Sequence, residues 1–228
     1  MSDLIISVSG LRGIVGESLT PDVAVRFVGA YASKLPAGPI VVGRDGRSSG
    51  IMLKQAIIAA LTACGRDCID ADVAATPTVG VLVRQRNAAG AVQISASHNP
   101  PPYNGIKLFG PDGRVLDAVT GGSIRDTYLA GEAAWCSFDK IGSAPPESDP
   151  HADHLDMVLA TVDVDAIRDL DIPEEVMPLK WMEGTAGAYV FDRKAYESAR
   201  ELHPAEFEKV SAHVETKPKK ASVTIKLA

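Results

Sequence analysis

The feature that most constrains the fold of this 228-residue chain is a regular alternation of short apolar runs with helical patterns. Each apolar run has the length of a strand, and most intervening stretches carry apolar residues at helical spacing. This alternation predicts a three-layer α/β/α domain, with a mixed, mostly parallel sheet and helices on both faces. The runs that we expect to be strands are residues 4–8, 40–43, 68–73, 91–94 and 106–109.

Residues with known capping preferences mark the ends of the expected helices. Thr20 and Pro21 suit the N-cap and the first position of a helix that follows the first strand, and Ser48 or Ser49 suits the N-cap of the next helix. Gly65 is expected to end that second helix, because glycine readily adopts the left-handed conformation found at helix C-termini.

A polar loop between two strand-like runs is the strongest candidate for a functional site. It lies within Gly90–Phe109, which reads GAVQISASHNPPPYNGIKLF. Ser97 follows a buried strand and is therefore placed to act as a nucleophile or a phosphoryl carrier. The prolines at 100–102 should make the loop stiff, and Asn104-Gly105 is expected to turn the chain into the second strand.

This stretch resembles the active-site serine loop of the α-D-phosphohexomutases, the family of phosphoglucomutase, phosphomannomutase and phosphoglucosamine mutase. The residues that carry the resemblance are Ser95-Ala96-Ser97-His98-Asn99-Pro100, followed by Asn104-Gly105-Ile106-Lys107. A match of this length with several uncommon residues is far more specific than a lone glycine pattern. The alternative is a proline-rich connecting loop that contains an incidental Ser-His pair.

The resemblance implies a hexose-phosphate mutase, which moves a phosphoryl group between C1 and C6 of a hexose phosphate through a hexose bisphosphate. It implies that Ser97 is the phosphoserine, that Lys107 is a candidate general acid/base and that His98 assists or orients the site. Asn99 and Asn104 are expected to bind substrate or phosphate. A lysine serves as an acid/base only if burial or nearby cations lower its pKa. The alternatives are a solvated strand lysine at 107 and, at 98, a loop histidine bonded to the backbone.

Arg12 is a further candidate for phosphate binding. It lies between Gly10 and Gly13, and these glycines allow the expected loop to turn sharply and present the guanidinium. Arginine suits bidentate recognition of phosphate, although a surface arginine in a flexible loop is the commoner case. A similar Gly-hydrophobic-Arg-Gly segment lines the active site of the phosphohexomutases, so the resemblance adds Arg12 to the expected site.

A charged segment, Arg44-Asp45-Gly46-Arg47-Ser48-Ser49, follows the strand at 40–43 and resembles a Gly-Arg-Asp-x-Arg-x-Ser segment of the same family. For Asp45 and Arg47 we favour a structural role, as a charge cluster that pins the turn between strand and helix. Functional loops of such sheets gather at the carboxyl ends of the strands. We therefore expect Arg44, Thr76 and Ser97 to converge on one edge.

The resemblance also implies Mg²⁺, held between the phosphate on Ser97 and three aspartates in an Asp-Gly-Asp-x-Asp-Arg pattern. The sequence contains no such pattern. Asp163 and Asp165 are two residues apart on a helical pattern, so their side chains are expected to diverge. The metal ligand expected in this chain is therefore Ser97, through its phosphate.

The sequence divides into a phosphohexomutase-like domain at 1–142, a linker rich in proline, serine and acidic residues at 143–150, and a partial or divergent second α/β segment at 151–228. The resemblance extends from residue 1 to about 170. The later patterns predict helices within 154–168 and 192–202 and a last strand at 222–227. A partial second domain with an exposed sheet edge would favour self-association.

Composition narrows the class of partner. A net charge of −6 argues against a nucleic-acid partner, and no apolar run is long enough to span a membrane. The first residues lack the basic segment of a secretory signal, and the three cysteines leave at least one unpaired, which fits a reducing compartment. We therefore expect a cytoplasmic location.

Two functions from different classes remain open. The first is a hexose-phosphate mutase in a shortened or divergent form. The second is a non-catalytic phosphosugar-binding paralogue or a gene fragment.

Overall fold

The computed structural model describes residues 4–163, 179–182, 188–191, 200 and 203–212. The chain divides into two compact units, Met1–His154 and Leu155–Ala228. In chain order, the first unit contains β1 (Ile5–Ser7), β2 (Gly10–Ile14), α1 (Pro21–Lys34), β3 (Ile40–Arg44), α2 (Ser49–Ala63), β4 (Cys68–Val73), α3 (Thr76–Gln85), β5 (Gly90–Ile94), β6 (Tyr103–Phe109), α4 (Ala118–Leu129) and the 3₁₀ helix η1 (Phe138–Lys140).

The strands of the first unit form a six-stranded mixed sheet in the order β1-β2-β6-β5-β3-β4. β3 pairs in parallel with β4 and with β5. β6 pairs antiparallel with β5 and with β2, and β2 pairs antiparallel with β1. Parallel pairing is therefore less extensive than expected. β5 and β6 are joined by residues 95–102 alone, which is too short for the crossover that parallel strands require.

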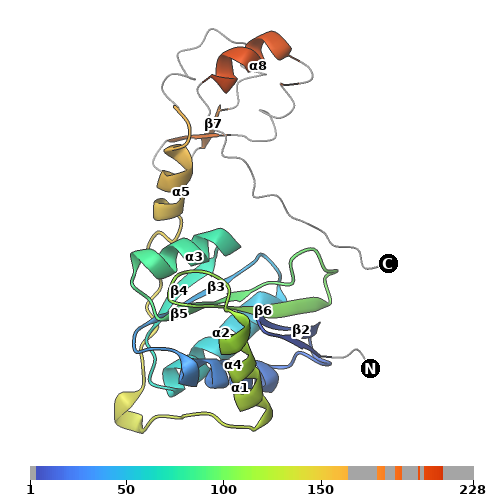
Figure 1. The fold of residues 1–228 in the computed structure, drawn as a ribbon, viewed down its shortest axis with the longest axis vertical. Helices are drawn as coiled ribbons and strands as arrows, with labels where there is room; N and C mark the ends of the chain where they lie inside the picture. Colours follow the sequence, from blue (N-terminus) through green and yellow to red (C-terminus); the bar gives the residue numbers. More distant parts are fainter. Residues whose placement is uncertain (1–3, 164–178, 183–187, 192–199, 201–202, 213–228) are drawn as a thin grey trace. The chain divides into compact units, whose positions relative to one another are not determined.

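Helices cover both faces of this sheet, with α1, α2 and α4 on one side and α3 on the other (Figure 1). Successive strand residues point to opposite faces. Ile40 and Val42 of β3 accordingly belong to the core beneath α1, α2 and α4, whereas Val41 packs with Val79 and Leu82 of α3. The predicted three-layer α/β/α architecture is confirmed.

The predicted helix ends are confirmed where local chemistry determines them. Thr20 is the extended N-cap of α1, and Pro21 is its first residue. Ser48 is the N-cap of α2, although its side chain makes no capping hydrogen bond. Gly65 follows the C-cap of α2 with a φ of 75°, the left-handed conformation that glycine adopts at low cost.

Two segments predicted as a loop and a turn are strands in the structure. Arg12 lies within β2, opposite Gly105 of β6, and Asn104 lies within β6, opposite Gly13. The chain turns earlier, where the Tyr103 N–H donates to the Pro100 carbonyl at 3.0 Å. The interpretation of Asn104-Gly105 as a turn was wrong because it considered local preference alone, whereas pairing with β2 holds both residues extended.

The start of the predicted linker is bound to the first unit. The Cys68 N–H donates to the Ser143 carbonyl at 2.7 Å, and the Glu147 N–H donates to the Asp70 carbonyl at 2.8 Å. Residues 143–147 therefore run along β4, which is the edge strand of the sheet. The boundary between the two units lies farther along the chain, after His154.

The remaining described elements are α5 (Ala152–Leu159), β7 (Leu179–Met182), β8 (Ala188–Phe191) and α8 (Pro204–Ser211). β7 and β8 pair antiparallel. The helix predicted after the linker is thus present as α5. The last predicted strand, at 222–227, and nearly all of the helix predicted at 192–202 lie outside the described residues.

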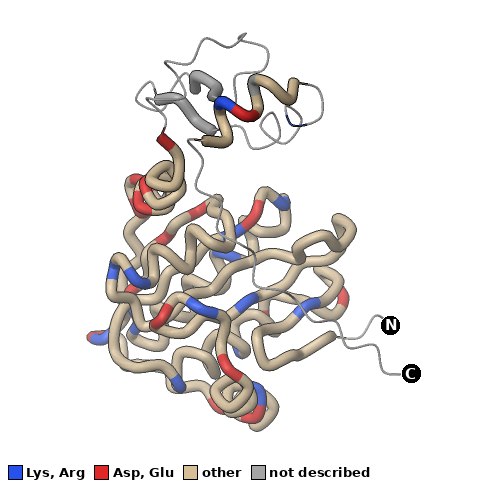
Figure 2. Tube along the Cα trace, turned by 45° about the horizontal axis from the view of Figure 1, so that its top comes forward, with Lys and Arg blue, Asp and Glu red and all other residues tan. Residues whose placement is uncertain are grey.

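Acidic and basic residues are interspersed along the trace of the first unit (Figure 2). Among the described helices, none is both long and apolar enough to cross a bilayer.

Candidate active site

Ser97 lies in the loop that follows β5, in an unusual backbone conformation. Its φ is 57°, in the left-handed region that residues other than glycine, asparagine and aspartate rarely adopt. The Ser97 N–H donates to the Ser95 hydroxyl at 3.1 Å. Ser95 and Ala96 are buried, whereas Ser97 is exposed. The fold therefore directs this serine to the surface at a backbone cost typical of functional sites.

His98 is the nearest titratable neighbour of Ser97 in sequence and is also exposed. Its Nδ1 lies 3.5 Å from Ser97 Oγ. That distance is at the long limit for a hydrogen bond, so the pair is a loose one as it stands. The imidazole lies close enough to assist proton transfer at the serine if the contact shortens.

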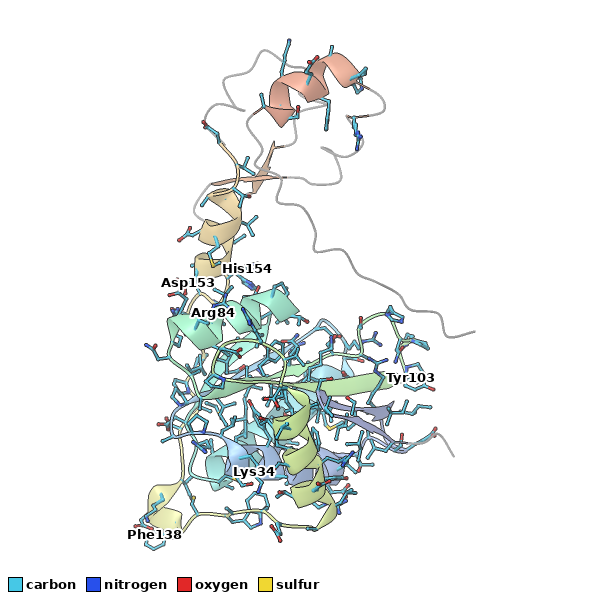
Figure 3. All side chains as sticks on the ribbon, in the orientation of Figure 1. Lys34, Arg84, Tyr103, Phe138, Asp153 and His154 are labelled. Atoms are coloured by element: carbon cyan, nitrogen blue, oxygen red, sulfur yellow. The ribbon has the colours of Figure 1, made fainter. Side chains whose placement is uncertain are left out.

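Arg47 binds the backbone of the serine loop through hydrogen bonds. Its Nη2 donates to the carbonyls of Ser97 at 3.1 Å and Asn99 at 2.6 Å. Its Nη1 donates to the carbonyls of Pro100 at 3.0 Å and Tyr103 at 3.2 Å. Tyr103 marks the point where the loop rejoins the sheet (Figure 3). One guanidinium thus binds four carbonyls between Ser97 and Tyr103.

Asp45 connects this arginine to the turn after β3. Its Oδ1 accepts the Arg47 N–H at 3.1 Å, and its Oδ2 lies 3.3 Å from Arg47 Nε. The prediction that Asp45 and Arg47 pin the turn is confirmed. The same arginine also binds the serine loop, which was not predicted from the sequence.

The two asparagines predicted as substrate ligands have different surroundings. Asn104 is fully buried, its Nδ2 donates to the Ser49 hydroxyl at 3.0 Å, and its Oδ1 accepts the Gly105 N–H at 2.8 Å. Its side chain thereby ties β6 to the first turn of α2. Asn99 is partly buried in the loop, and its N–H donates to the Ala96 carbonyl at 3.1 Å.

Two cationic residues, Arg12 and Lys107, line one cavity that also reaches Ser95 at the start of the loop. Lys107 lies opposite Gly10 and Arg12 opposite Gly105, so the two are diagonal neighbours on one face of the β2–β6 pair. Both line a cavity of about 390 Å³, as do Ser95 and Thr76. The cavity thus combines two positive charges with hydroxyl groups, which suits a phosphorylated ligand.

The predicted convergence on one sheet edge is present. β3 and β5 are parallel, so Arg44 and the serine loop lie at the same end of the sheet. Thr76 lines the same cavity as Ser95. The Arg44 guanidinium, however, is bound to Asp72, with Nε 2.9 Å from Oδ1 and Nη2 3.3 Å from Oδ2.

Asp72 belongs to a charge network that also contains Lys54 and Asp70. Lys54 Nζ lies 2.7 Å from Asp70 Oδ2 and 2.8 Å from Asp72 Oδ1. The hydrogen bonds from Lys54 and then Arg44 lower the pKa of Asp72. Burial opposes the charge on Lys54, but its bonds to the two carboxylates outweigh burial and raise its pKa. The network neutralises the carboxylates beside the site.

The described residues do not by themselves fit a magnesium ion. They contain no group of three or more His, Cys, Asp or Glu side chains that would hold a metal. Asp70 and Asp72 lie together, but both are bound to Lys54. A phosphate on Ser97 would supply oxygen ligands of the kind that Mg²⁺ prefers, and the carboxylate ligands would have to come from elsewhere.

Comparisons with known proteins show which proteins this chain is similar to. Residues 4–134 match the family described as phosphoglucomutase/phosphomannomutase, alpha/beta/alpha domain I. A phosphoglucosamine mutase of Parasynechococcus marenigrum (strain WH8102) is 38% identical over 181 residues, which are 78% of this chain and 38% of the relative. Another, of Prochlorococcus marinus (strain MIT 9313), is 40% identical over 189 residues, which are 80% of this chain and 39% of the relative.

A solved structure has the same fold. It is that of a phosphoglucomutase/phosphomannomutase family protein from Burkholderia thailandensis, with a TM-score of 0.60 at 24% sequence identity. The similarity covers 69% of this chain and 37% of that one.

Fold and site together define a three-layer α/β/α domain that presents a serine at one edge of its sheet. The chain belongs to the phosphoglucomutase/phosphomannomutase family, of which it carries domain I. The resemblance based on the serine loop is thereby confirmed. The chain spans about two fifths of the length of the curated relatives that it matches, 38% and 39% in the two cases above.

Proposed function

We propose that this chain is the phosphoserine-bearing part of a hexose-phosphate mutase, with Ser97 as the residue that carries the phosphoryl group. The observation that carries the proposal is the Ser97 backbone, which is held at a φ of 57° with the side chain exposed. A serine in an ordinary connecting loop has no need of this conformation. The cationic cavity lined by Arg12, Lys107 and Ser95 supports the proposal, because phosphoryl transfer requires concentrated positive charge.

The proposed reaction moves a phosphoryl group between C1 and C6 of a hexose phosphate. The substrate hydroxyl attacks phosphorus, the bond between phosphorus and Ser97 Oγ breaks, and a hexose bisphosphate forms. The proton that leaves the substrate hydroxyl is assigned to Lys107 as the general acid/base, and the departing Ser97 oxygen takes up a proton, for which His98 is the adjacent side chain. Transfer from the other end of the bisphosphate restores phosphoserine and releases the isomeric monophosphate.

Binding roles follow from the positions of the other predicted residues. Arg12 is assigned to a substrate phosphate because it lines the cavity together with Lys107. Asn99 lies in the loop and is assigned to the substrate or to the phosphate on Ser97. Asn104 is assigned an indirect part, since its buried side chain already binds Ser49 and the Gly105 backbone.

The substrate class that we propose is a hexose phosphate, with the corresponding bisphosphate as phosphoryl donor. Both curated relatives described above are named phosphoglucosamine mutase, which favours the glucosamine phosphates over those of glucose. Mg²⁺ would lie against the phosphate on Ser97 and neutralise charge there. We assign no step to it, because the described residues lack the other ligands.

Phosphoryl transfer from a labelled bisphosphate to the chain tests the proposal. Glucosamine 1,6-bisphosphate and glucose 1,6-bisphosphate are compared as donors in the presence of Mg²⁺. The wild-type chain is expected to take up label, and more rapidly from the glucosamine compound. Ser97→Ala should take up none, whereas Ser123→Ala, which alters an exposed serine of α4, should behave as wild type.

The labelling experiment, combined with a calorimetric titration, separates the two functions that the sequence left open. A non-catalytic phosphosugar-binding protein would bind glucosamine 6-phosphate in a calorimetric titration and take up no label from either donor. Label in both wild type and Ser97→Ala would place the phosphoryl group on another residue and refute the assignment of Ser97.

A further inference from the structure

We propose that Arg47 is a positioning residue that sets the reactive conformation of the phosphoserine loop. The inference rests on the proposed function, because it assigns Arg47 a part in phosphoryl transfer at Ser97. Arg47 lies in the segment between β3 and α2, and it acts on the reacting serine through the carbonyls of the loop.

The hydrogen bonds of Arg47 use the whole guanidinium. Nη2 donates to two loop carbonyls, Nη1 donates to one loop carbonyl and to that of Tyr103 at the start of β6, and Nε donates to Asp45. The side chain is only 19% exposed. Each N–H of the fork thus has an acceptor, which a lysine could not reproduce, since an ammonium has fewer donors and no planar arrangement.

The loop benefits from such a partner because its own N–H groups reach few of its carbonyls, those of Ala96 and Pro100 among them. Residues 100–102 are all proline and have no N–H group to donate. The carbonyls of Ser97, Asn99, Pro100 and Tyr103 all point at one guanidinium. Oxygens that converge in this way repel one another unless a cation lies between them. Arg47 is that cation, and one of its bonds is to the carbonyl of Ser97 itself.

Asp45 and Arg44 hold Arg47 in place. Asp45 accepts the Arg47 N–H, and Arg44 donates to the Asp45 carbonyl at 3.2 Å. Arg44 is in turn fixed by Asp72. The loop is therefore attached through Arg47 to the carboxyl end of β3, which is a central strand of the sheet.

The bond pattern also separates Arg47 from a ligand-binding arginine. Its donors are all engaged within the protein, whereas Arg12 and Lys107 line the cavity. Loss of Arg47 should therefore slow phosphoryl transfer without weakening attraction of the phosphorylated donor. Loss of Arg12 should have its main effect on the donor concentration needed for half the maximal rate.

A second arginine provides a matched control. Arg66 donates to the carbonyls of Ala32 at 2.7 Å, Leu35 at 2.9 Å and Pro36 at 2.6 Å. It binds the carbonyls at the end of α1 in the way that Arg47 binds those of the serine loop. Arg66 makes these bonds far from Ser97 along the chain, so its removal tests what the loss of an arginine–carbonyl cluster does to the fold alone.

The test compares Arg47→Ala, Arg47→Lys and Arg66→Ala with the wild-type chain, once each variant has been shown to fold by circular dichroism. The rate of label transfer from the hexose bisphosphate is measured over a range of donor concentrations. A displacement of about 1 Å at a reacting group costs roughly 100-fold in rate. We expect a fall of that order in the maximal rate for Arg47→Ala, with the half-saturating concentration unchanged within about threefold, and a similar fall for Arg47→Lys.

Two further readouts separate positioning from stability. Added guanidinium ion should restore part of the rate in Arg47→Ala, because it can re-enter the vacated space, and it should have no effect on Arg66→Ala. Hydrogen exchange at the amides of Ser97 and Asn99 should accelerate in Arg47→Ala but not in Arg66→Ala. Arg66→Ala should lower the melting temperature while leaving the transfer rate unchanged.

A wild-type rate and wild-type exchange in Arg47→Ala would overturn the inference. An equal loss of rate in Arg66→Ala would also overturn it, because the effect would then be one of general stability. If the wild-type chain takes up no label, the proposed function is wrong. The exchange comparison would then decide whether Arg47 holds the loop, and unchanged exchange would refute that as well.

Discussion

The two halves of the sheet differ in what they contribute to the site. The parallel half, β4-β3-β5, consists of strands linked by helices, and its strands contribute more core residues than those of the other half. The antiparallel half, β6-β2-β1, carries Arg12 and Lys107 on adjacent strands. The serine loop connects the two halves, since it joins β5 to β6. The parallel half thus supports the site, while the antiparallel half supplies its charge.

The contact between β2 and β6 is the most sensitive place to break this arrangement. A Cβ on Gly10 would lie 1.9 Å from the Ile106 carbonyl oxygen, and the φ of Gly10 is 145°. Gly10→Ala should therefore lower the free energy of unfolding by about 3 kcal/mol, through steric overlap and backbone strain together. Urea denaturation measures the change.

Gly122→Ala is the control for this substitution. Gly122 lies in α4, and a Cβ there would meet nothing within 4 Å. Replacement of a helical glycine by alanine should stabilise the protein by about 0.5–1 kcal/mol. If Gly10→Ala proved as harmless, the close approach of β2 to β6 would not exist as described.

The charge supplied by the antiparallel half can be removed with less damage to the fold. Lys107 is partly exposed in β6, so Lys107→Ala should leave the melting temperature nearly unchanged. As a general acid/base, it should contribute about 100-fold to the rate of phosphoryl transfer. Labelling kinetics measure this loss. A wild-type rate in Lys107→Ala would show that Lys107 is a solvated strand residue and not the general acid/base.

Tyr31 of α1 binds both halves of the sheet. Its hydroxyl donates to the Phe109 carbonyl of β6 at 2.7 Å and lies 3.1 Å from the Ala91 carbonyl of β5. Tyr31→Phe leaves these buried carbonyls without their partner and should cost about 1–2 kcal/mol in unfolding free energy. Thermal and urea denaturation at neutral pH provide the comparison.

Burial of Tyr31 also makes the free energy of unfolding depend on pH in alkaline solution. Desolvation raises the pKa of the phenol far above its ordinary value near 10. Above a pH near 10, the phenol loses its proton in the unfolded chain but keeps it in the folded chain. The free energy of unfolding should therefore fall by about 1.4 kcal/mol per pH unit. Tyr31→Phe should lack this component of the decline. Identical slopes in the two proteins would mean that the hydroxyl is not buried.

The smallest expected effect concerns the charge network of the parallel half. Lys54 and Arg44 lower the pKa of Asp72, so the carboxylate stabilises the fold above its usual pKa near 4. This contribution is lost as the pH falls through the lower folded value. As the pH is lowered below about 4, the free energy of unfolding should therefore fall slightly less steeply in Asp72→Asn than in the wild-type protein. A steeper limb in the variant would contradict the ion pairs.

The sequence predicted the parallel half better than the antiparallel half, for a physical reason. Thr20, Pro21 and Gly65 act through local backbone preferences, so the ends of α1 and α2 were readable from the sequence. Arg12 and Asn104 owe their conformations to pairing between strands about ninety residues apart. No local pattern contains that pairing.

Glycine misled the interpretation of this region in a specific way. A Cβ on Gly105 would lie 2.9 Å from the Ser95 carbonyl oxygen and 3.0 Å from that of Leu11. Glycine within a strand marks a close approach of another backbone. The same residue was interpreted as part of a turn, because Asn-Gly favours turns when its neighbours are unknown.

Candidate site residues could be proposed from the sequence where they form a continuous motif. Ser97, His98 and Lys107 were proposed from the serine loop, and Arg12 from its flanking glycines and a similar segment of the family, and their roles stay predictions. The part of Arg47 was missed, although Arg44-Asp45-Gly46-Arg47 had been noticed. The partners of Arg47 are backbone carbonyls about fifty residues away. Every residue has a backbone carbonyl, so the sequence does not indicate which of them an arginine binds.

Mapping of the phosphoryl group by mass spectrometry tests the central claim most directly. The wild-type chain is incubated with glucosamine 1,6-bisphosphate and Mg²⁺, digested, and the peptide that contains residues 90–109 is fragmented. We predict one phosphoryl group, on Ser97 and not on Ser95, and none on this peptide in Ser97→Ala. An unmodified peptide, or a phosphoryl group on Ser95, would contradict the assignment of Ser97 as the phosphoryl carrier.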